Sequence, residues 1–63
     1  MNHIPKNEKI WVIIRKRGKE NYHVITSKED NRSKYYIYNC HNGMADRLGN
    51  SKSPSELEEK WPL

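Results

Sequence analysis

The chain has 63 residues, carries 12 Lys and Arg against 8 Asp and Glu, and has a net charge of +4 at pH 7. Hydrophobic residues make up 33% of it and Phe is absent. We expect one small domain with a thin core, because a chain this short buries only about 60% of the surface it exposes when unfolded. It has little room for a substrate pocket and carries no phosphate loop or nucleophile motif. We therefore expect a protein that is not an enzyme, with no catalytic residues and no cofactor.

The single cysteine, Cys40, cannot form an internal disulfide, which is typical of proteins in reducing compartments. No apolar run approaches the roughly 18 residues that span a bilayer. The first such run, at residues 10–14, is also shorter than the apolar region of a signal peptide. We expect a cytoplasmic protein without membrane contact.

Cys40 lies beside His41, with His3 and His23 elsewhere, and these residues lack the Cys/His spacing of a structural zinc site. Neighbouring residues of a strand point to opposite faces, which argues against a catalytic Cys/His pair. The sequence indicates a small buried thiol next to a turn histidine. No metal site is expected.

Residues 1–9 are polar, contain Pro5 and show no periodicity, so we expect a flexible N-terminal segment before a single domain over residues 10–63. The domain opens with the run Ile-Trp-Val-Ile-Ile at residues 10–14, whose β-branched side chains favour a strand. Both faces of this strand are apolar. That pattern is typical of a strand in the centre of a sheet.

Gly18 can adopt the positive φ that a tight hairpin tip needs, and residues 22–26 then return as a second strand. The register of this hairpin is left open by the sequence. A three-residue tip would place Val24 on the face of Val12, whereas a four-residue tip would place it beside Trp11. A slip of one residue exchanges the two faces.

Residues 27–33 are polar and predict a turn, and residues 34–41 return to strand character. Alternation along this third strand places three residues on one face, namely Tyr36, Tyr38 and Cys40. The dipeptide Asn42-Gly43 follows directly and is the strongest short-range signal for a hairpin. A short fourth strand is predicted at residues 44–48.

Residues 53–56, Ser-Pro-Ser-Glu, predict the start of a helix. The first serine caps it, the proline takes the first helical position, and the glutamate completes a capping box. The helix should cover residues 54–61 and place Leu57 and Trp61 on one face. The sequence therefore predicts an α+β fold: a small antiparallel meander sheet of three to four strands, with one C-terminal α-helix packed on one face.

Residues 1–26 hold six Lys and Arg against two Glu, whereas the rest of the chain is nearly balanced. Four of these cations gather at the predicted hairpin tip, namely Arg15, Lys16, Arg17 and Lys19. A basic hairpin suits contact with phosphates, because each neutralised phosphate releases counterions. The alternative is a solvated tip whose charges discourage edge pairing. We predict a small basic nucleic-acid-binding module, for DNA rather than RNA, with Arg32 and Lys34 extending the phosphate contacts.

The aromatic residues suggest a second function. One helix covers one face of a sheet, so aromatics on the other face could stack on bases. Tyrosines fall on both faces of the third strand, however, which favours a role in the core. The alternative function is a small protein-binding regulator or inhibitor that uses an exposed sheet face or strand edge around Trp11, Ile13 and Tyr35. Its partner would be an acidic protein surface, and a homodimer is compatible with either function.

The run Ile-Arg-Lys-Arg-Gly-Lys at residues 14–19 precedes an aromatic strand, a polar turn, another strand and the Ser-x-x-Glu box at residues 53–56. Over residues 10–61 this layout resembles the AP2-like arm-type DNA-binding domain at the N-terminus of tyrosine recombinases. The resemblance implies a DNA-binding module whose sheet enters the major groove. The Asn42-Gly43 hairpin and the fourth strand depart from that three-stranded layout, and a catalytic recombinase domain is not expected.

Overall fold

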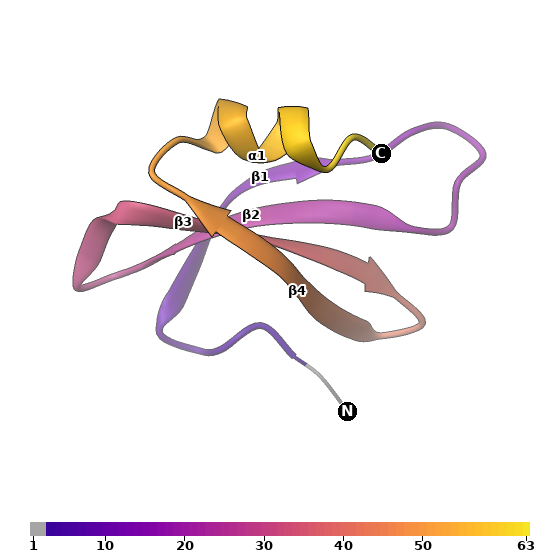
Figure 1. The fold of residues 1–63 in the computed structure, drawn as a ribbon. Coiled ribbons are helices and arrows are strands. Elements are labelled where there is room, and N and C mark those ends of the chain that lie inside the picture. Colours follow the sequence, from indigo (N-terminus) through magenta and orange to yellow (C-terminus); the bar gives the residue numbers. More distant parts are fainter. Residues whose placement is uncertain (1–2) are drawn as a thin grey trace.

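Four antiparallel strands and one helix make up the computed structural model, which describes residues 3–63 (Figure 1). The strands lie across the sheet in the order β1-β2-β3-β4, so each one pairs with its neighbour in the sequence. Their bounds are Glu8–Ile14 for β1, Tyr22–Lys28 for β2, Asn31–His41 for β3 and Met44–Ser51 for β4, and α1 spans Pro54–Lys60. The predicted α+β fold, a meander sheet with a C-terminal helix, is confirmed.

The connections alternate between the two ends of the sheet. Asn42 has a φ of 48° and Gly43 a φ of 73°, which are the left-handed conformations that a type I′ turn needs. The β3–β4 hairpin therefore forms at the predicted dipeptide. Gly18, with a φ of 82°, lies in the loop of residues 15–21 that joins β1 to β2. This loop and the Asn42-Gly43 turn lie at one end of the sheet, and the β2–β3 turn lies at the other (Figure 1).

A bulge at Trp11 determines the register that the sequence left open. Ile10 pairs with Thr26 but Val12 pairs with Ile25, so Trp11 is an extra residue with no partner across the strand pair. An extra residue interrupts the alternation of side chains along a strand. Ile10 therefore shares a face with Thr26, whereas Val12 shares the opposite face with Ile25. Neither register inferred from the tip length describes the whole strand.

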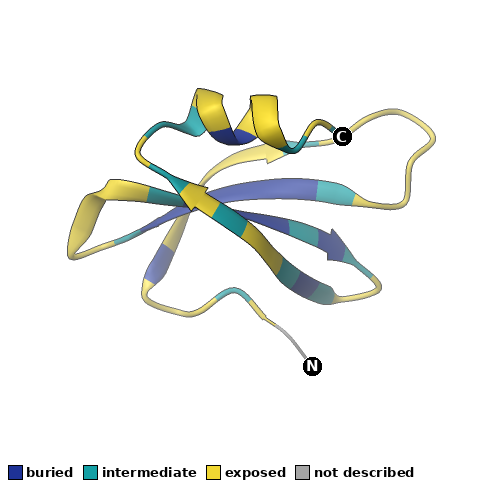
Figure 2. Ribbon diagram, viewed as in Figure 1, coloured by how far each residue is buried: buried dark blue, intermediate teal, exposed yellow. Residues whose placement is uncertain are grey.

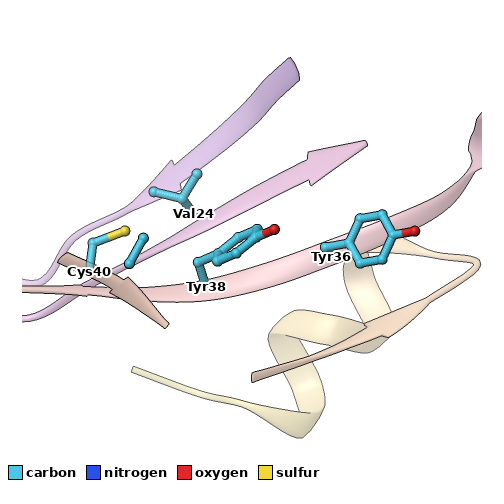
Figure 3. Packing of buried hydrophobic residues seen from close by; sticks show 5 residues of the cluster. Val24, Tyr36, Tyr38 and Cys40 are labelled. Carbon is cyan, nitrogen blue, oxygen red and sulfur yellow. The ribbon is translucent and has the colours of Figure 1, made fainter. Parts of the chain in front are cut away.

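The two faces of the sheet carry separate apolar clusters, which we call the helix face and the helix-free face. On the helix face the fully buried residues are Ile25, Ile37 and Leu57, with Ile14, Tyr35 and Trp61 packed around them. On the helix-free face the buried residues are Val24, Tyr36, Tyr38, Cys40 and Ala45, with Ile4 and Tyr22 packed against them. Figure 3 shows the second cluster projecting away from α1. The predicted alternation along β3 and the shared face of Leu57 and Trp61 are confirmed.

The expectation that the first strand lies in the centre of the sheet is wrong. β2 and β3 are central and β1 is an edge strand. Figure 2 shows the contrast between exposed β1 and buried β2. The exposed fractions are 47% for Ile10, 44% for Trp11, 36% for Val12 and 55% for Ile13. A meander must leave its first strand at an edge, and α1 makes its main contacts with β3 and β4.

The strands extend further than the sequence predicts. β1 begins at Glu8, where the expected flexible segment still continues, and the Glu8 N–H donates to the Pro5 carbonyl at 3.1 Å. The predicted polar turn at residues 27–33 is wrong in extent, because Ser27 is a buried member of β2. The Trp11 indole Nε1 donates to Ser27 Oγ at 2.6 Å. This bond lets a polar side chain be buried beneath the edge strand.

The helix begins where predicted but without the predicted capping box. Ser53 is the N-cap residue and a proline occupies the first turn, yet the Ser53 side chain makes no capping hydrogen bond. Glu56 instead accepts a hydrogen bond from Ser51 Oγ at 2.7 Å and pairs with Lys60 at 3.1 Å. These interactions lower the pKa of Glu56. The helix ends one residue earlier than expected, with Trp61 as its C-cap.

Trp61 packs against Gly49 of β4, and a side chain at that position would collide with it. A Cβ on Gly49 would lie 2.1 Å from the nearest ring carbon of Trp61. We expect Gly49→Ala to lower the free energy of unfolding by about 1–3 kcal/mol, because overpacking displaces the ring from the sheet. Urea denaturation measures the change. Asn50→Ala, at an exposed neighbouring position, is the control, and equal stability of the two variants would contradict the packing.

The burial of His23 predicts that the folded protein becomes less stable in mild acid. Its side chain is buried on the helix face, its Nδ1 has no hydrogen-bond partner, and burial lowers its pKa from the ordinary value of 6.5. The unfolded chain therefore binds a proton that the folded chain resists as the pH falls below 6.5. The stability from neutral His23 is present above that pH and is lost below it. Urea titrations at about pH 7.5 and about pH 5.5 should show a decrease that His23→Gln reduces.

Candidate nucleic-acid interface

A buried carboxylate organises the helix-free face. The side chain of Glu8 is only 1% exposed, although it stands in an edge strand. Its Oε1 accepts hydrogen bonds from Thr26 Oγ1 at 2.7 Å and from the Tyr38 hydroxyl at 2.6 Å. Its Oε2 pairs with the Arg47 guanidinium at 2.6 Å. The carboxylate of Glu8 in β1 is thereby bonded to one residue in each of the other three strands.

Arg47 and Tyr38 complete this network. The Arg47 guanidinium donates to the Tyr38 hydroxyl from Nε at 3.0 Å and from Nη2 at 2.7 Å. Burial and the hydrogen bond to Glu8 raise the pKa of Tyr38 to about 12. The phenol therefore stays protonated near neutral pH and keeps donating to the carboxylate. The charge of Glu8 is satisfied internally and is not presented to a partner.

Three cations converge on Tyr36 of the same face, and we call them with this ring the Tyr36 cluster. Arg47 Cζ lies 4.2 Å from the ring centroid, Lys34 Nζ 5.8 Å and Lys28 Nζ 6.0 Å. These distances fall within the range of cation–π attraction. Tyr36 itself is only 6% exposed. The ring therefore holds the cations at the surface, and it is too well covered to stack on a base.

The basic tip lies at the other end of the sheet. Its four cations stand in the exposed loop of residues 15–21. Arg15 Cζ lies 4.4 Å from the centroid of Tyr22, which packs against the helix-free cluster. Along β2, Tyr22 is four positions from Thr26, the residue that pairs with Tyr36. At about 3.3 Å per residue, Tyr22 and Thr26 are roughly 13 Å apart along the strand, and the remaining cations of the tip lie beyond Tyr22.

Several acidic residues lie away from the Tyr36 cluster. Glu56, Glu58 and Glu59 are exposed on α1, which covers the helix face. In β4, Asp46 alternates with Arg47 and pairs with His41 Nε2 at 3.6 Å. Three carboxylates thus stand on the side of the molecule opposite the Tyr36 cluster, whereas Glu20 lies in the basic loop and Glu29 and Asp30 lie in the β2–β3 turn.

The structure divides the residues predicted to contact phosphates. Arg15, Lys16, Arg17 and Lys19 are together at the tip, but Lys34 lies near the far end of the sheet in the Tyr36 cluster. Arg32 also lies near that end, where its Cζ is 5.9 Å from the centroid of Trp11. The basic residues therefore form two separate groups rather than one track. The reason is the meander, which sends the β2–β3 turn to the end opposite the tip.

The sequence analysis did not predict Lys28 and Arg47 as members of the basic surface. Lys28 fell within an expected turn and Arg47 stood alone in the predicted fourth strand, so neither appeared next to other cations. The alternation of β3 did contain a signal, since it places Lys34 and Tyr36 on the same face.

The residues proposed for protein binding are also divided. Trp11 and Ile13 are exposed on β1, whereas Tyr35 is half-buried in the helix-face cluster.

Cys40 is buried, which raises the pKa of its thiol. Within residues 3–63 no three His, Cys, Asp or Glu residues are grouped so that they could hold a metal ion. No helix in this part of the chain is long and apolar enough to cross a membrane.

Comparisons with known proteins give no relative. No family model, no curated protein and no solved structure matches the chain. The resemblance to the arm-type domains therefore rests on the basic run and the helix start alone. The fourth strand, which departs from that layout, is present in the structure.

The network predicts that Glu8→Gln destabilises the protein. The substitution leaves the Arg47 guanidinium without its anionic partner and weakens a buried set of hydrogen bonds. We expect the free energy of unfolding to fall by about 1–3 kcal/mol. Urea denaturation checks this, with Glu56→Gln on the exposed helix as the control. A loss no larger than that of the control would show that the network does not support the sheet.

Proposed function

We propose that the protein binds nucleic acid, and DNA first of all, through its helix-free face and basic tip. The observation that carries this proposal is the convergence of Lys28, Lys34 and Arg47 on Tyr36. Cations repel one another, so a group of them on one face favours a polyanionic ligand. The carboxylate on that face, Glu8, is already satisfied by its own hydrogen bonds.

The lysines of the Tyr36 cluster are available for phosphates. The ion pairs found within residues 3–63 engage Arg47, Lys60 and His41, and none of them uses Lys28 or Lys34. The two ammonium groups lie near the ring of Tyr36, which belongs to the helix-free cluster. Lysine heads of this kind contact phosphates as point charges. Binding of this type depends on charge and weakens steeply as the salt concentration rises, because the counterions that binding releases gain less entropy in a more concentrated solution.

The spacing of the basic groups favours a duplex. The strand positions nearest to the two basic groups, Tyr22 and Thr26, are separated by roughly 13 Å along β2, which is of the order of the width of the major groove of B-DNA, about 12 Å. The two groups could contact the phosphates on either side of one groove. This arrangement agrees with what the resemblance to arm-type domains implies, a sheet placed at the major groove.

Charge reversal on the helix-free face tests the proposal. Labelled duplex DNA, single-stranded DNA and RNA are titrated with the protein at two salt concentrations and followed by fluorescence anisotropy. We expect Lys34→Glu and Lys28→Glu each to weaken duplex binding roughly tenfold and to reduce the salt slope by about 0.9 per lost contact. Lys60→Glu makes the same charge change on α1 and is the matched control. Equal weakening by all three variants would reduce the effect to net charge and contradict a defined interface.

The basic tip is tested separately. Arg15→Glu combined with Arg17→Glu should abolish duplex binding while the circular dichroism spectrum is retained, because both side chains are exposed. A duplex affinity that survives this double substitution would remove the tip from the interface. Tighter binding of RNA or single strands than of the duplex would overturn the assignment to DNA.

A further inference from the structure

Among residues 3–63 no strand pairs with the outer edge of β1, and this edge is apolar. β1 pairs with β2 on one side and ends the sheet on the other. Of the five large hydrophobic side chains that are exposed within residues 3–63, four are consecutive in this strand and the fifth is Leu48. An exposed apolar strand edge is a template for another strand, because its outward N–H and C=O groups have no partner. The edge is therefore a docking surface in the plane of the sheet, and Ile10 and Ile13 stand beside it on the helix-free face.

Cations stand at both ends of this edge. At its start, Lys9 Nζ lies 4.8 Å and Arg32 Cζ 5.9 Å from the centroid of Trp11. At its end, the chain continues directly into the basic tip that begins at Arg15. The carboxylate of β1, on Glu8, is turned into the network of the helix-free face. The edge thus presents an apolar centre with positive charge on either side.

We propose that β1 binds an extended acidic segment of a partner protein, which adds to the sheet as a fifth strand. The segment would have β-branched or other apolar residues at its centre and Asp or Glu at both ends. Main-chain hydrogen bonds to the free edge would supply affinity, and side chains over Ile10, Val12 and Ile13 would supply apolar contact. The terminal carboxylates would meet the cations at the two ends.

Charge favours this occupant over a second copy of the chain. In an antiparallel pair of β1 strands, Lys9 of one copy approaches the Arg15 end of the other. In a parallel pair, each cation meets its own equivalent. Either arrangement brings like charges together across the edge, which is destabilising for directly opposed residues. The cations therefore act against self-association while they attract an acidic strand.

The bulge at Trp11 defines which part of the edge is regular. From Val12 to Ile14 each residue pairs in order with β2, so its outward groups follow the ordinary pattern of a strand. Trp11 is fixed by its hydrogen bond to Ser27 Oγ. The bulge thus leaves a short regular segment for pairing, flanked on one side by an indole that already carries two cations. The incoming strand would be centred on residues 12–14.

Two synthetic peptides test the proposal on the full chain. The probe is fluorescein-labelled Glu-Glu-Val-Thr-Val-Thr-Val-Glu-Glu, and the comparison peptide replaces each Glu with Lys. We expect the acidic peptide to bind and the basic peptide to bind at least roughly tenfold more weakly. In ¹H–¹⁵N spectra the acidic peptide should shift the amides of residues 10–14. Shifts confined to the tip would show charge attraction without strand addition and would overturn the proposal.

Neutral substitutions test the apolar contacts of the edge. Ile10→Ser with Ile13→Ser should weaken the acidic peptide roughly tenfold, which corresponds to about 1.4 kcal/mol. Leu48→Ser, on β4 at the other edge of the sheet, is the matched control. Lys28→Glu and Lys34→Glu should weaken the peptide less than this double variant, because Lys28 lies in β2 and Lys34 in β3, inside the sheet from the edge strand.

Two further results would overturn the proposal. If light scattering shows a dimer, and the Ile10/Ile13 double variant is a monomer, the edge pairs with a second copy of the chain. If duplex DNA shifts the amide signals of residues 10–14 and the acidic peptide does not, the edge binds nucleic acid and not a protein strand.

Discussion

The carboxylate of Glu8 is the constraint on which the sheet depends. A charge that is almost fully buried must be compensated by nearby donors. Thr26, Tyr38 and Arg47 provide them, and these residues come from β2, β3 and β4. The helix face is closed by α1 and an apolar cluster, but within residues 3–63 no helix or second sheet covers the helix-free face. Its strands are instead joined by one shared polar network, which suits a chain with few hydrophobic residues and no Phe.

This network also shapes the charged surface. Because Arg47 is held by Glu8 and Tyr38, its guanidinium is positioned over Tyr36, where Lys28 and Lys34 also lie. The same interaction removes the acidic charge of that face from contact with a ligand. The acidic residues of α1 lie on the opposite side. A structural ion pair and a basic surface are therefore two consequences of one arrangement.

The two proposed surfaces would bind their partners through different kinds of interaction. The helix-free face offers fixed cations, so its affinity would vary strongly with salt. The β1 edge offers main-chain groups and exposed aliphatic side chains, whose contribution is less sensitive to salt. They meet at the tip, where β1 ends and the loop of residues 15–21 begins. A protein of this size could thus contact a nucleic acid and an acidic partner segment on adjoining surfaces.

Local signals in the sequence were sufficient for the strands, the Asn42-Gly43 turn, the start of α1 and the facing of Tyr36 and Tyr38, because each depends on neighbouring residues. The basic tip was also evident, since its cations are consecutive or nearly so. The pairing of Glu8 with Arg47, 39 residues apart, could not be inferred. The bulge at Trp11, the edge position of β1 and the separation of the basic residues into two groups likewise depend on strand order and register. These are non-local properties, and they arise only when the whole sheet is assembled.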